Sequence, residues 1–109
     1  MKIMSSHDEM LLLVILKLGD SAYGVTIRQE ISKATGKNWS IGAIYDPLYR
    51  LEKRELVASF LSDPTTARGG RSKRLFSVTR KGRQQLNAHK SIRDNLWQAL
   101  EESGVEYEK

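Results

Sequence analysis

The segment from residue 38 to residue 54 constrains the fold most, because it joins the pattern of an amphipathic helix to a proline in its middle. Ser40 is a favourable N-cap, since its hydroxyl can accept a hydrogen bond from a backbone N–H that has no partner inside the helix. Trp39 can pack against Ile44 one turn later and fix the entry of the chain. Pro47 lacks a backbone N–H, so the helix is expected to bend just before it.

The predicted helix has two faces of different chemistry. Its apolar face has helical spacing and is expected to pack against a core; this face consists of Ile41, Ile44, Tyr45, Leu48 and Leu51. The outer face starts with small residues and continues with polar and cationic ones, namely Ser40, Gly42, Ala43, Asp46, Tyr49, Arg50 and Lys53. Small residues permit close approach and cations favour an anionic partner, and the major groove of DNA meets both conditions. Tyr45 belongs to the core side, although its hydroxyl can reach outward.

Length and composition restrict the possible classes of protein. A chain of 109 residues forms one small domain. Its 18 Lys and Arg residues outnumber 13 Asp and Glu residues, and the net charge of +5 favours a polyanionic partner. The chain contains no cysteine, which excludes disulfides and thiolate metal sites, and its isolated histidines do not suggest a metal centre.

The sequence also contains no motif that carries catalysis. Nucleophile motifs, phosphate-binding loops and paired carboxylates in an apolar context are all missing, so neither an enzyme nor a cofactor is expected. No apolar run reaches the roughly 20 residues of a membrane span, and the N-terminus lacks the pattern of a secretory signal. We therefore expect a cytoplasmic protein without a membrane partner.

Two helices are predicted before the central segment. Ser6 and Glu9 have the spacing of a capping box, and the apolar run that follows continues to a stop at Gly19. Because this run is apolar nearly all round, part of its cover is expected from a second copy of the chain. The second helix is expected at residues 25–34, with Ile27, Ile31 and Ala34 on its inner face and Arg28, Gln29 and Lys33 on its outer face. Together with the central helix it forms a helix-turn-helix candidate.

Beyond residue 54 the pattern becomes extended. Residues 56–61 and 74–78 favour strands, and the polar, glycine-rich and basic segment between them predicts the loop of a β-hairpin. Its cations can follow a phosphate backbone or enter a narrow minor groove; they are Arg68, Arg71, Lys73 and Arg74. The alternative is a flexible, soluble connector. Three helices followed by a hairpin describe a winged helix, with this loop as its wing.

A last helix is predicted from residue 80 to residue 102, with Thr79 as its N-cap. Its apolar side chains are Leu86, Ile92, Leu96, Trp97 and Leu100. Charge is segregated in this part of the chain, because residues 64–93 contain no Asp or Glu and residues 68–93 hold half of all Lys and Arg. Such segregation predicts one strongly positive surface.

Several motifs in this order resemble the PadR family of bacterial transcriptional regulators, especially its short members. Residues 23–27 are similar to its Tyr-Gly-x-x-Ile element, residues 44–52 to its recognition-helix pattern, and residues 69–83 to its Gly-Gly-Arg wing and the Thr-x-x-Gly-Arg sequence after it. Two positions depart from the pattern. The proline that usually follows the tyrosine directly is displaced to Pro47, and the glycine after the recognition helix is replaced by Glu55.

The resemblance implies a mainly α-helical protein with a small β-hairpin: a winged helix-turn-helix at residues 6–79, a C-terminal dimerisation helix at residues 80–103 and an acidic tail at residues 104–109. It further implies a homodimer that represses transcription from a palindromic operator in double-stranded DNA. The expected DNA-binding residues are Ser40, Gly42, Ala43, Tyr45, Tyr49, Arg50, Lys53, Arg68, Arg71, Lys73 and Arg74. The expected dimer interface is Leu12, Ile15, Leu16, Ile92, Leu96, Trp97 and Leu100.

Two alternatives stay open on the sequence alone. Two copies of Trp97 could face each other across the dimer axis and hold a small aromatic effector, or Trp97 could simply pack in the interface or against the first helix. The basic surface could also serve an adaptor that binds protein or RNA without sequence-specific readout of DNA. A preferred site in a random pool of duplexes would distinguish the regulator from the adaptor.

Overall fold

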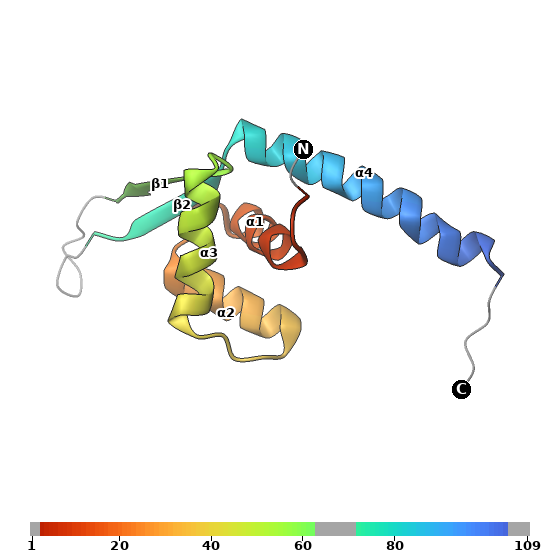
Figure 1. Cartoon of the computed structure of the whole chain (residues 1–109). Helices are drawn as coiled ribbons and strands as arrows, with labels where there is room; N and C mark the ends of the chain where they lie inside the picture. The colour runs from red at the N-terminus through yellow and green to blue at the C-terminus, as the bar shows by residue number, and fades with distance from the viewer. Residues whose placement is uncertain (1–2, 63–71, 105–109) are drawn as a thin grey trace.

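The computed structural model describes residues 3–62 and 72–104. Within these ranges the chain forms four α-helices, one short 3-10 helix and a two-stranded antiparallel sheet (Figure 1). In chain order the elements are α1 (Ser6–Leu18), η1 (Gly19–Ser21), α2 (Gly24–Thr35), α3 (Ile41–Lys53), β1 (Val57–Leu61), β2 (Arg74–Val78) and α4 (Arg80–Glu102). Their order and type confirm the predicted winged helix-turn-helix followed by a C-terminal helix. Among these described helices, none is long and apolar enough to cross a membrane.

α1 lies at the centre of the winged-helix part and contacts α2, α3, β2 and α4. Leu12 and Ile15 are 0% and 2% exposed, so they belong to the core of the protomer itself. The prediction that they join a dimer interface is therefore wrong, because elements of the same chain already cover them. Leu16 is half-buried against this core, and Leu13 is the exposed leucine of α1.

The start of α1 differs from the predicted start. Ser5 rather than Ser6 is the N-cap, and its hydroxyl accepts a hydrogen bond from the backbone N–H of Asp8 at 3.0 Å. Glu9 is not part of a capping box, because its side chain is buried and turned toward α4. The local spacing of Ser6 and Glu9 therefore suggested a cap, whereas a tertiary contact determines where Glu9 points.

Tyr45 explains why α2 begins with a glycine. A Cβ atom at Gly24 would lie 1.8 Å from the Tyr45 hydroxyl oxygen, so only glycine lets this ring pack against the first turn of α2. Further along the helix, Ile27 and Ile31 are buried as predicted, whereas Ala34 is exposed. The contact between Gly24 and Tyr45 sets how closely α2 and α3 approach each other.

α3 is one continuous helix that passes through Pro47 without a break. Ser40 caps it as predicted, because its hydroxyl accepts a hydrogen bond from the Ala43 N–H at 3.1 Å. The buried stripe begins with Ile44, which is 1% exposed. Ile41 is 55% exposed, so its predicted place in the core is wrong: as the first helical residue it lies beyond the edge of the core.

The end of α3 keeps a glycine-type cap without a glycine. Glu55 has a φ of 64°, and it is the only non-glycine residue with a positive φ among those that the structure describes. The Leu56 N–H donates to the Leu51 carbonyl at 3.0 Å, and the Glu55 N–H donates to the Glu52 carbonyl at 2.9 Å. These two hydrogen bonds form a Schellman motif, in which glycine is normally favoured because it has no Cβ to strain.

The hairpin is attached to the helices at its base. β1 and β2 pair antiparallel, with Val57 opposite Val78. An isolated bridge between Tyr23 and Leu75 connects β2 to the residue just before α2. The hairpin therefore has a fixed position relative to α2.

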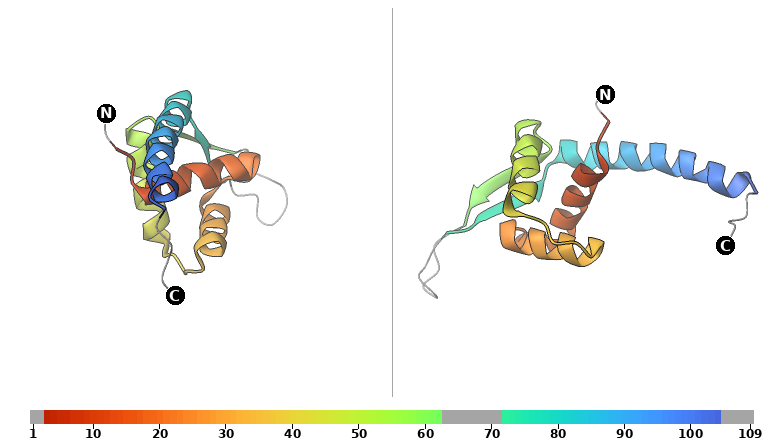
Figure 2. Two further views of the ribbon diagram at one scale, coloured as in Figure 1. Left: turned by 90° about the vertical axis from the view of Figure 1, so that its right-hand side faces the viewer. Right: turned by 60° about the horizontal axis from the view of Figure 1, so that its bottom comes forward.

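α4 starts at the hairpin and extends away from the other elements (Figures 1 and 2). Thr79 caps it as predicted, since its hydroxyl accepts a hydrogen bond from the Gly82 N–H at 3.0 Å. A Cβ atom at Gly82 would lie 2.3 Å from the Leu56 carbonyl oxygen, so the first turn of α4 packs directly on the backbone that follows α3. All side chains of residues 91–102 are exposed.

A polar cluster around the buried Glu9 carboxylate holds the first half of α4 against α1. Arg93 donates a hydrogen bond from Nη1 to the Glu9 carboxylate at 2.7 Å. His89 is also buried, and its Nε2 lies 3.8 Å from the other oxygen of the same carboxylate. The cluster therefore helps to set the direction in which α4 leaves the winged-helix part.

Candidate nucleic-acid interface

The outer face of α3 is open to solvent. Among its members, Ser40, Gly42, Arg50 and Lys53 are exposed, Tyr49 is 50% exposed, and Ala43 and Tyr45 are half-buried. Gly42 has open space around it, because a Cβ atom there would meet only the Asp46 carboxylate, at an ordinary 3.7 Å. Packing inside the chain thus does not require glycine at this position. The small side chains at the start of α3 leave room for an external partner.

Two tyrosines connect this outer face to the core. The rings of Tyr45 and Tyr49 are stacked, with centroids 5.9 Å apart and planes at 28°. Tyr45 is held in turn by its contact with Gly24. The exposed ring of Tyr49 is therefore supported by Tyr45.

A groove of about 390 Å³ separates α2 from the first half of α3. Its lining residues are Gly24, Val25, Arg28, Gln29, Ser32, Asn38, Ile41, Ile44 and Tyr45. Arg28 donates a hydrogen bond from Nε to the Trp39 carbonyl at 2.6 Å, which joins α2 to the segment before α3. Arg28 and Gln29 are exposed on the outer face of α2, as their spacing predicts, but they are not among the predicted DNA-binding residues. Their polar character at outward positions was the available signal.

The cations at the base of the hairpin are held by neighbouring side chains. Lys73 places Nζ over the Tyr23 ring, 4.2 Å from its centroid. Arg74 donates a hydrogen bond to the Ser59 hydroxyl at 3.0 Å, and Ser59 donates in turn to the Glu52 carboxylate on α3. This chain of contacts joins both strands of the hairpin to the last turns of α3.

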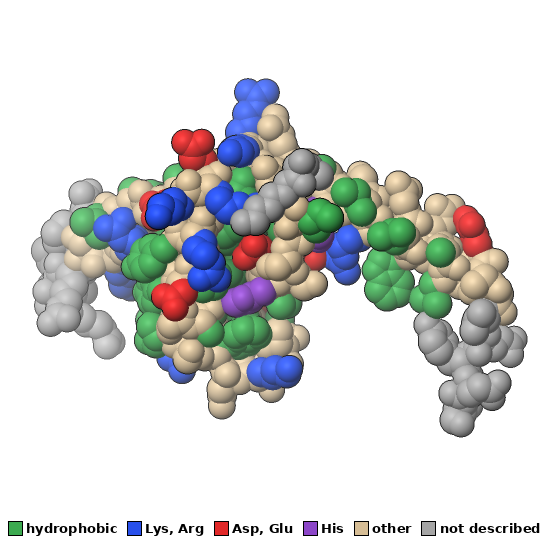
Figure 3. Space-filling model, viewed as in Figure 1, with side chains coloured by type: hydrophobic (Ala, Val, Ile, Leu, Met, Phe, Trp, Pro, Cys, Tyr) green, Lys and Arg blue, Asp and Glu red, His purple; other side chains and the backbone are tan. Residues whose placement is uncertain are grey.

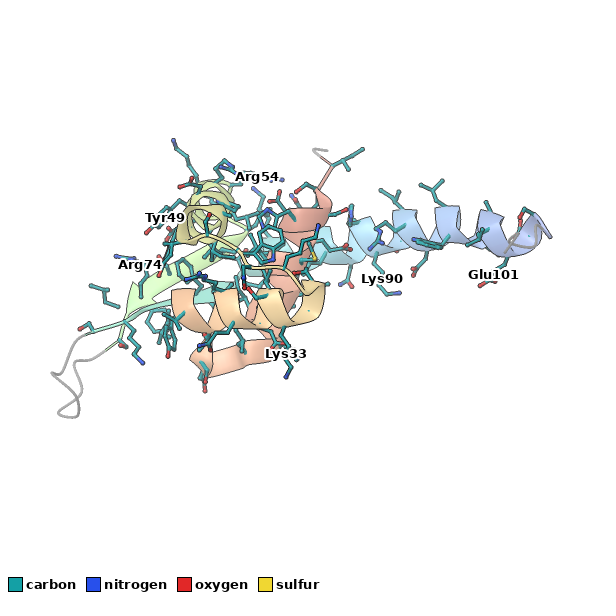
Figure 4. The ribbon with its side chains drawn as sticks, turned by 90° about the horizontal axis from the view of Figure 1, so that it is seen from below. Lys33, Tyr49, Arg54, Arg74, Lys90 and Glu101 are labelled. Atoms are coloured by element: carbon teal, nitrogen blue, oxygen red, sulfur yellow. The ribbon has the colours of Figure 1, made fainter. Side chains whose placement is uncertain are left out.

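α3 and the hairpin lie together at the end of the molecule opposite to the free end of α4 (Figures 1 and 2). Figure 4 shows Tyr49 and Arg74 on this same end, with Glu101 far along α4. Several Lys and Arg side chains lie over α3 and the base of the hairpin (Figure 3). The predicted loop cations Arg68 and Arg71 fall outside the described residues.

Five cations at this end of the molecule form no ion pair with any described residue. In the described part of the chain, no ion pair is formed by Arg28, Arg50, Lys53, Lys73 or Arg74. Elsewhere charges are paired: Lys17 lies 2.7 Å from Glu30, and this hydrogen bond lowers the pKa of the Glu30 carboxyl. Exposed cations without an ion-pair partner can attract a polyanion.

A second exposed surface has the opposite character. The distal face of α4 consists of Ile92, Leu96, Trp97 and Leu100, which are 42%, 70%, 58% and 39% exposed. Trp97 does not pack against α1 of its own chain, so that alternative for its role is excluded within the protomer. The distal face is apolar and uncovered by the described elements.

An exposed helix with unpaired cations lies beside a basic hairpin on a three-helix core. This arrangement is typical of the winged helix-turn-helix proteins, which bind DNA. The chain belongs to the PadR-like family of transcriptional regulators, whose model matches residues 12–88. This range includes α2, α3 and the hairpin. The chain is therefore a DNA-binding regulator of transcription and not an enzyme.

Solved structures show the same fold. A PadR-like regulator from Bacillus cereus has a TM-score of 0.70 and 21% identity over 92% of each chain. A transcriptional regulator from Clostridium thermocellum has a TM-score of 0.69 and 20% identity, covering 95% of this chain and 100% of its own. A PadR family regulator from Clostridium difficile has a TM-score of 0.64 and 23% identity, with 91% and 94% covered. No curated protein sequence matches the chain significantly.

Proposed function

We propose that this chain is a cytoplasmic transcriptional repressor that binds a palindromic operator as a homodimer. The unpaired cations on α3 and at the base of the hairpin carry the proposal. They lie on one end of the molecule, on two elements whose relative position is fixed by the contacts between Glu52, Ser59 and Arg74. A helix and a hairpin in this arrangement can contact adjacent parts of one duplex.

α3 is the element that reads the sequence. Its first turn faces the base edges, where the small residues Ser40, Gly42 and Ala43 permit close approach. Arg50 bonds a guanine edge with two hydrogen bonds, while Lys53 and Tyr49 hold phosphates. Tyr45 acts mainly as support for Tyr49, since its own hydroxyl oxygen packs against Gly24.

The hairpin adds contacts to the sugar-phosphate backbone. Lys73 and Arg74 flank the start of β2 and are exposed. Arg68 and Arg71 extend the same basic segment in the sequence. We assign all four to the phosphate backbone or to a narrow minor groove.

A second copy of the chain covers the distal face of α4. Removing its four apolar side chains from water stabilises a dimer by about 25 cal/mol per Å² of buried apolar area. We therefore regard residues 80–103 as the dimerisation helix and residues 6–79 as the DNA-binding part. Leu16, half-buried on α1, contributes at the edge of this interface. A two-fold axis through paired α4 helices requires an operator with the same symmetry.

The same interface offers a place for a small aromatic effector. Trp97 is 58% exposed and lies beside a shallow polar hollow formed with Asp94, Asn95, Gln98 and Glu101. Two indole rings that face each other across the dimer axis can enclose a flat ring. Such a ligand would relieve repression by changing how the two α4 helices pair.

Selection of bound sites from random duplex DNA tests the proposal. We expect a palindrome whose half-sites are separated by a fixed spacing, together with a dimer mass by light scattering. Affinity for that site should fall steeply with salt, because several phosphates are neutralised at once. A pool without any preferred sequence would instead support the adaptor, and a monomer at all concentrations would exclude the dimer.

A further inference from the structure

Two exposed aliphatic side chains flank the groove between α2 and α3. Val25, in the first turn of α2, is 53% exposed, and Ile41, the first residue of α3, is 55% exposed. Both line the same groove, while Ile44 and Tyr45 line its inner side. Neither exposed side chain fills the core, so both are available to contact a partner.

The surroundings of this aliphatic pair are polar and lack negative charge. Arg28, Gln29, Ser32 and Asn38 line the same groove, and no described acidic residue does so. An apolar protein helix would bury these polar groups without partners, which is unfavourable. A DNA base edge suits the surroundings better, because it presents hydrogen-bonding groups together with negative phosphates nearby.

Thymine is the base that matches an aliphatic contact. It alone presents a methyl group, at C5, in the major groove, and apolar side chains distinguish it by contact with that methyl. Ile41 lies at the N-terminal end of α3, the part of a recognition helix that approaches base edges. Gly42 directly after it adds no side chain that would hold the helix away from the duplex.

We propose that Ile41, supported by Val25, contacts the C5-methyl group of a thymine and thereby specifies a T·A pair in each half-site. The inference rests on the proposed function, and it names a specificity determinant beyond the cationic residues. Ile41 supplies the contact at the front of α3, and Val25 closes the apolar pocket from the side of α2.

Single replacement of thymine by deoxyuridine tests this contact, because it removes the methyl group and leaves the hydrogen-bonding pattern intact. Full-length protein is titrated with the selected operator and with duplexes that carry one deoxyuridine at each thymine in turn. One position per half-site should bind wild type about fourfold more weakly, the loss expected for one buried methyl group. Ile41→Ala should bind the thymine and deoxyuridine forms of that position equally well, and Val25→Ala should show a reduced difference.

Ile3→Ala is the matched control, since Ile3 is an aliphatic residue that is 74% exposed near the N-terminus. It should keep the full sensitivity to deoxyuridine. Wild type that is insensitive at every thymine, or Ile41→Ala that keeps the wild-type sensitivity, would overturn the inference while the proposed function stands. Loss of self-association in Ile41→Ala, measured by light scattering, would also overturn it, because the pair would then be a protein contact. Failure to select any operator would instead reject the proposed function itself.

Discussion

The outer face of α3 and the distal face of α4 are both left uncovered by the described chain, but their chemistry is opposite. On α3 the apolar stripe is buried inside the protomer. Cations such as Arg50 and Lys53 lie on the exposed face and form no ion pair with the described residues. On α4 it is Leu96 and Trp97 that remain outside. Exposed charge favours the binding of a hydrated polyanion, whereas exposed apolar area favours contact with another protein surface. One small chain thus separates its two kinds of contact by the length of one helix.

Placing charge on the distal face should give the largest effect. Leu96→Glu combined with Leu100→Glu puts carboxylates where an apolar interface is proposed, so light scattering should show a monomer. Operator affinity should fall by about 100-fold or more, because the two half-sites are then bound independently. Ser91→Glu is the control, since Ser91 is exposed and lies on the opposite side of the helix. A double variant that stays dimeric would show that the copies meet elsewhere.

Replacing cationic side chains on the outer face of α3 by alanine should leave the dimer intact and weaken DNA binding. Arg50→Ala should cost about 1–3 kcal/mol of operator affinity and relax the preference at one base pair. Lys53→Ala should weaken binding to all sequences alike and lower the salt slope by about one. Fluorescence anisotropy at several salt concentrations measures both.

Lys33→Ala is the control for these two variants, because Figure 4 shows Lys33 on a different side of the molecule from Tyr49. It removes the same amount of charge as either variant. If Lys33→Ala weakened binding as much as Arg50→Ala, net charge alone would account for the affinity, and α3 would not be the reading helix.

The polar cluster between the two regions can be opened at Arg93, which lies one turn before Leu96 on α4. Arg93→Met removes the hydrogen bond to the buried Glu9 carboxylate and should lower the free energy of unfolding by about 1–3 kcal/mol. Lys90→Met breaks only the exposed pair with Asp94, whose side chains are 71% and 60% exposed, and should cost at most about 0.5 kcal/mol. Urea unfolding measures the difference. Equal effects would mean that the position of Glu9 does not depend on Arg93.

The smallest expected effect lies at the end of α3. Glu55→Gly removes a strained Cβ at a φ of 64° and should raise the free energy of unfolding by about 1 kcal/mol. Glu55→Ala serves as the control, because it removes the same carboxylate and keeps the strain. Operator affinity should not change in either variant. Equal stability of the two would assign the effect to the loss of charge rather than to the backbone.

Features with a local cause could be predicted from the sequence. Ser40 and Thr79 are N-caps, and the bounds of the last helix and of the second strand follow from neighbouring residues. The outer face of α3 was predicted almost entirely, because helical spacing alone separates it from Leu48 and Leu51.

Features that depend on distant contacts could not be predicted in the same way. Leu12 and Ile15 form part of an apolar run, and only the tertiary arrangement shows that the chain covers them by itself. Glu9 and Arg93 are 84 positions apart in the sequence, so no local pattern links them. Ile41 has the spacing of a core residue, yet as the first residue of α3 it is 55% exposed.

The way α4 is anchored has a geometric consequence. Its 23 residues span about 35 Å at 1.5 Å per residue, and its buried residues, Gly82, Leu86 and His89, all lie in its first half. From His89 to the end of the helix is about 20 Å, so a tilt of about 10° around His89 moves that end by roughly 3.4 Å, which is about the rise between successive base pairs. A small change in packing around Glu9 and His89 is therefore amplified along α4, and the resulting displacement of its far end is large enough to affect the fit of a dimer to DNA.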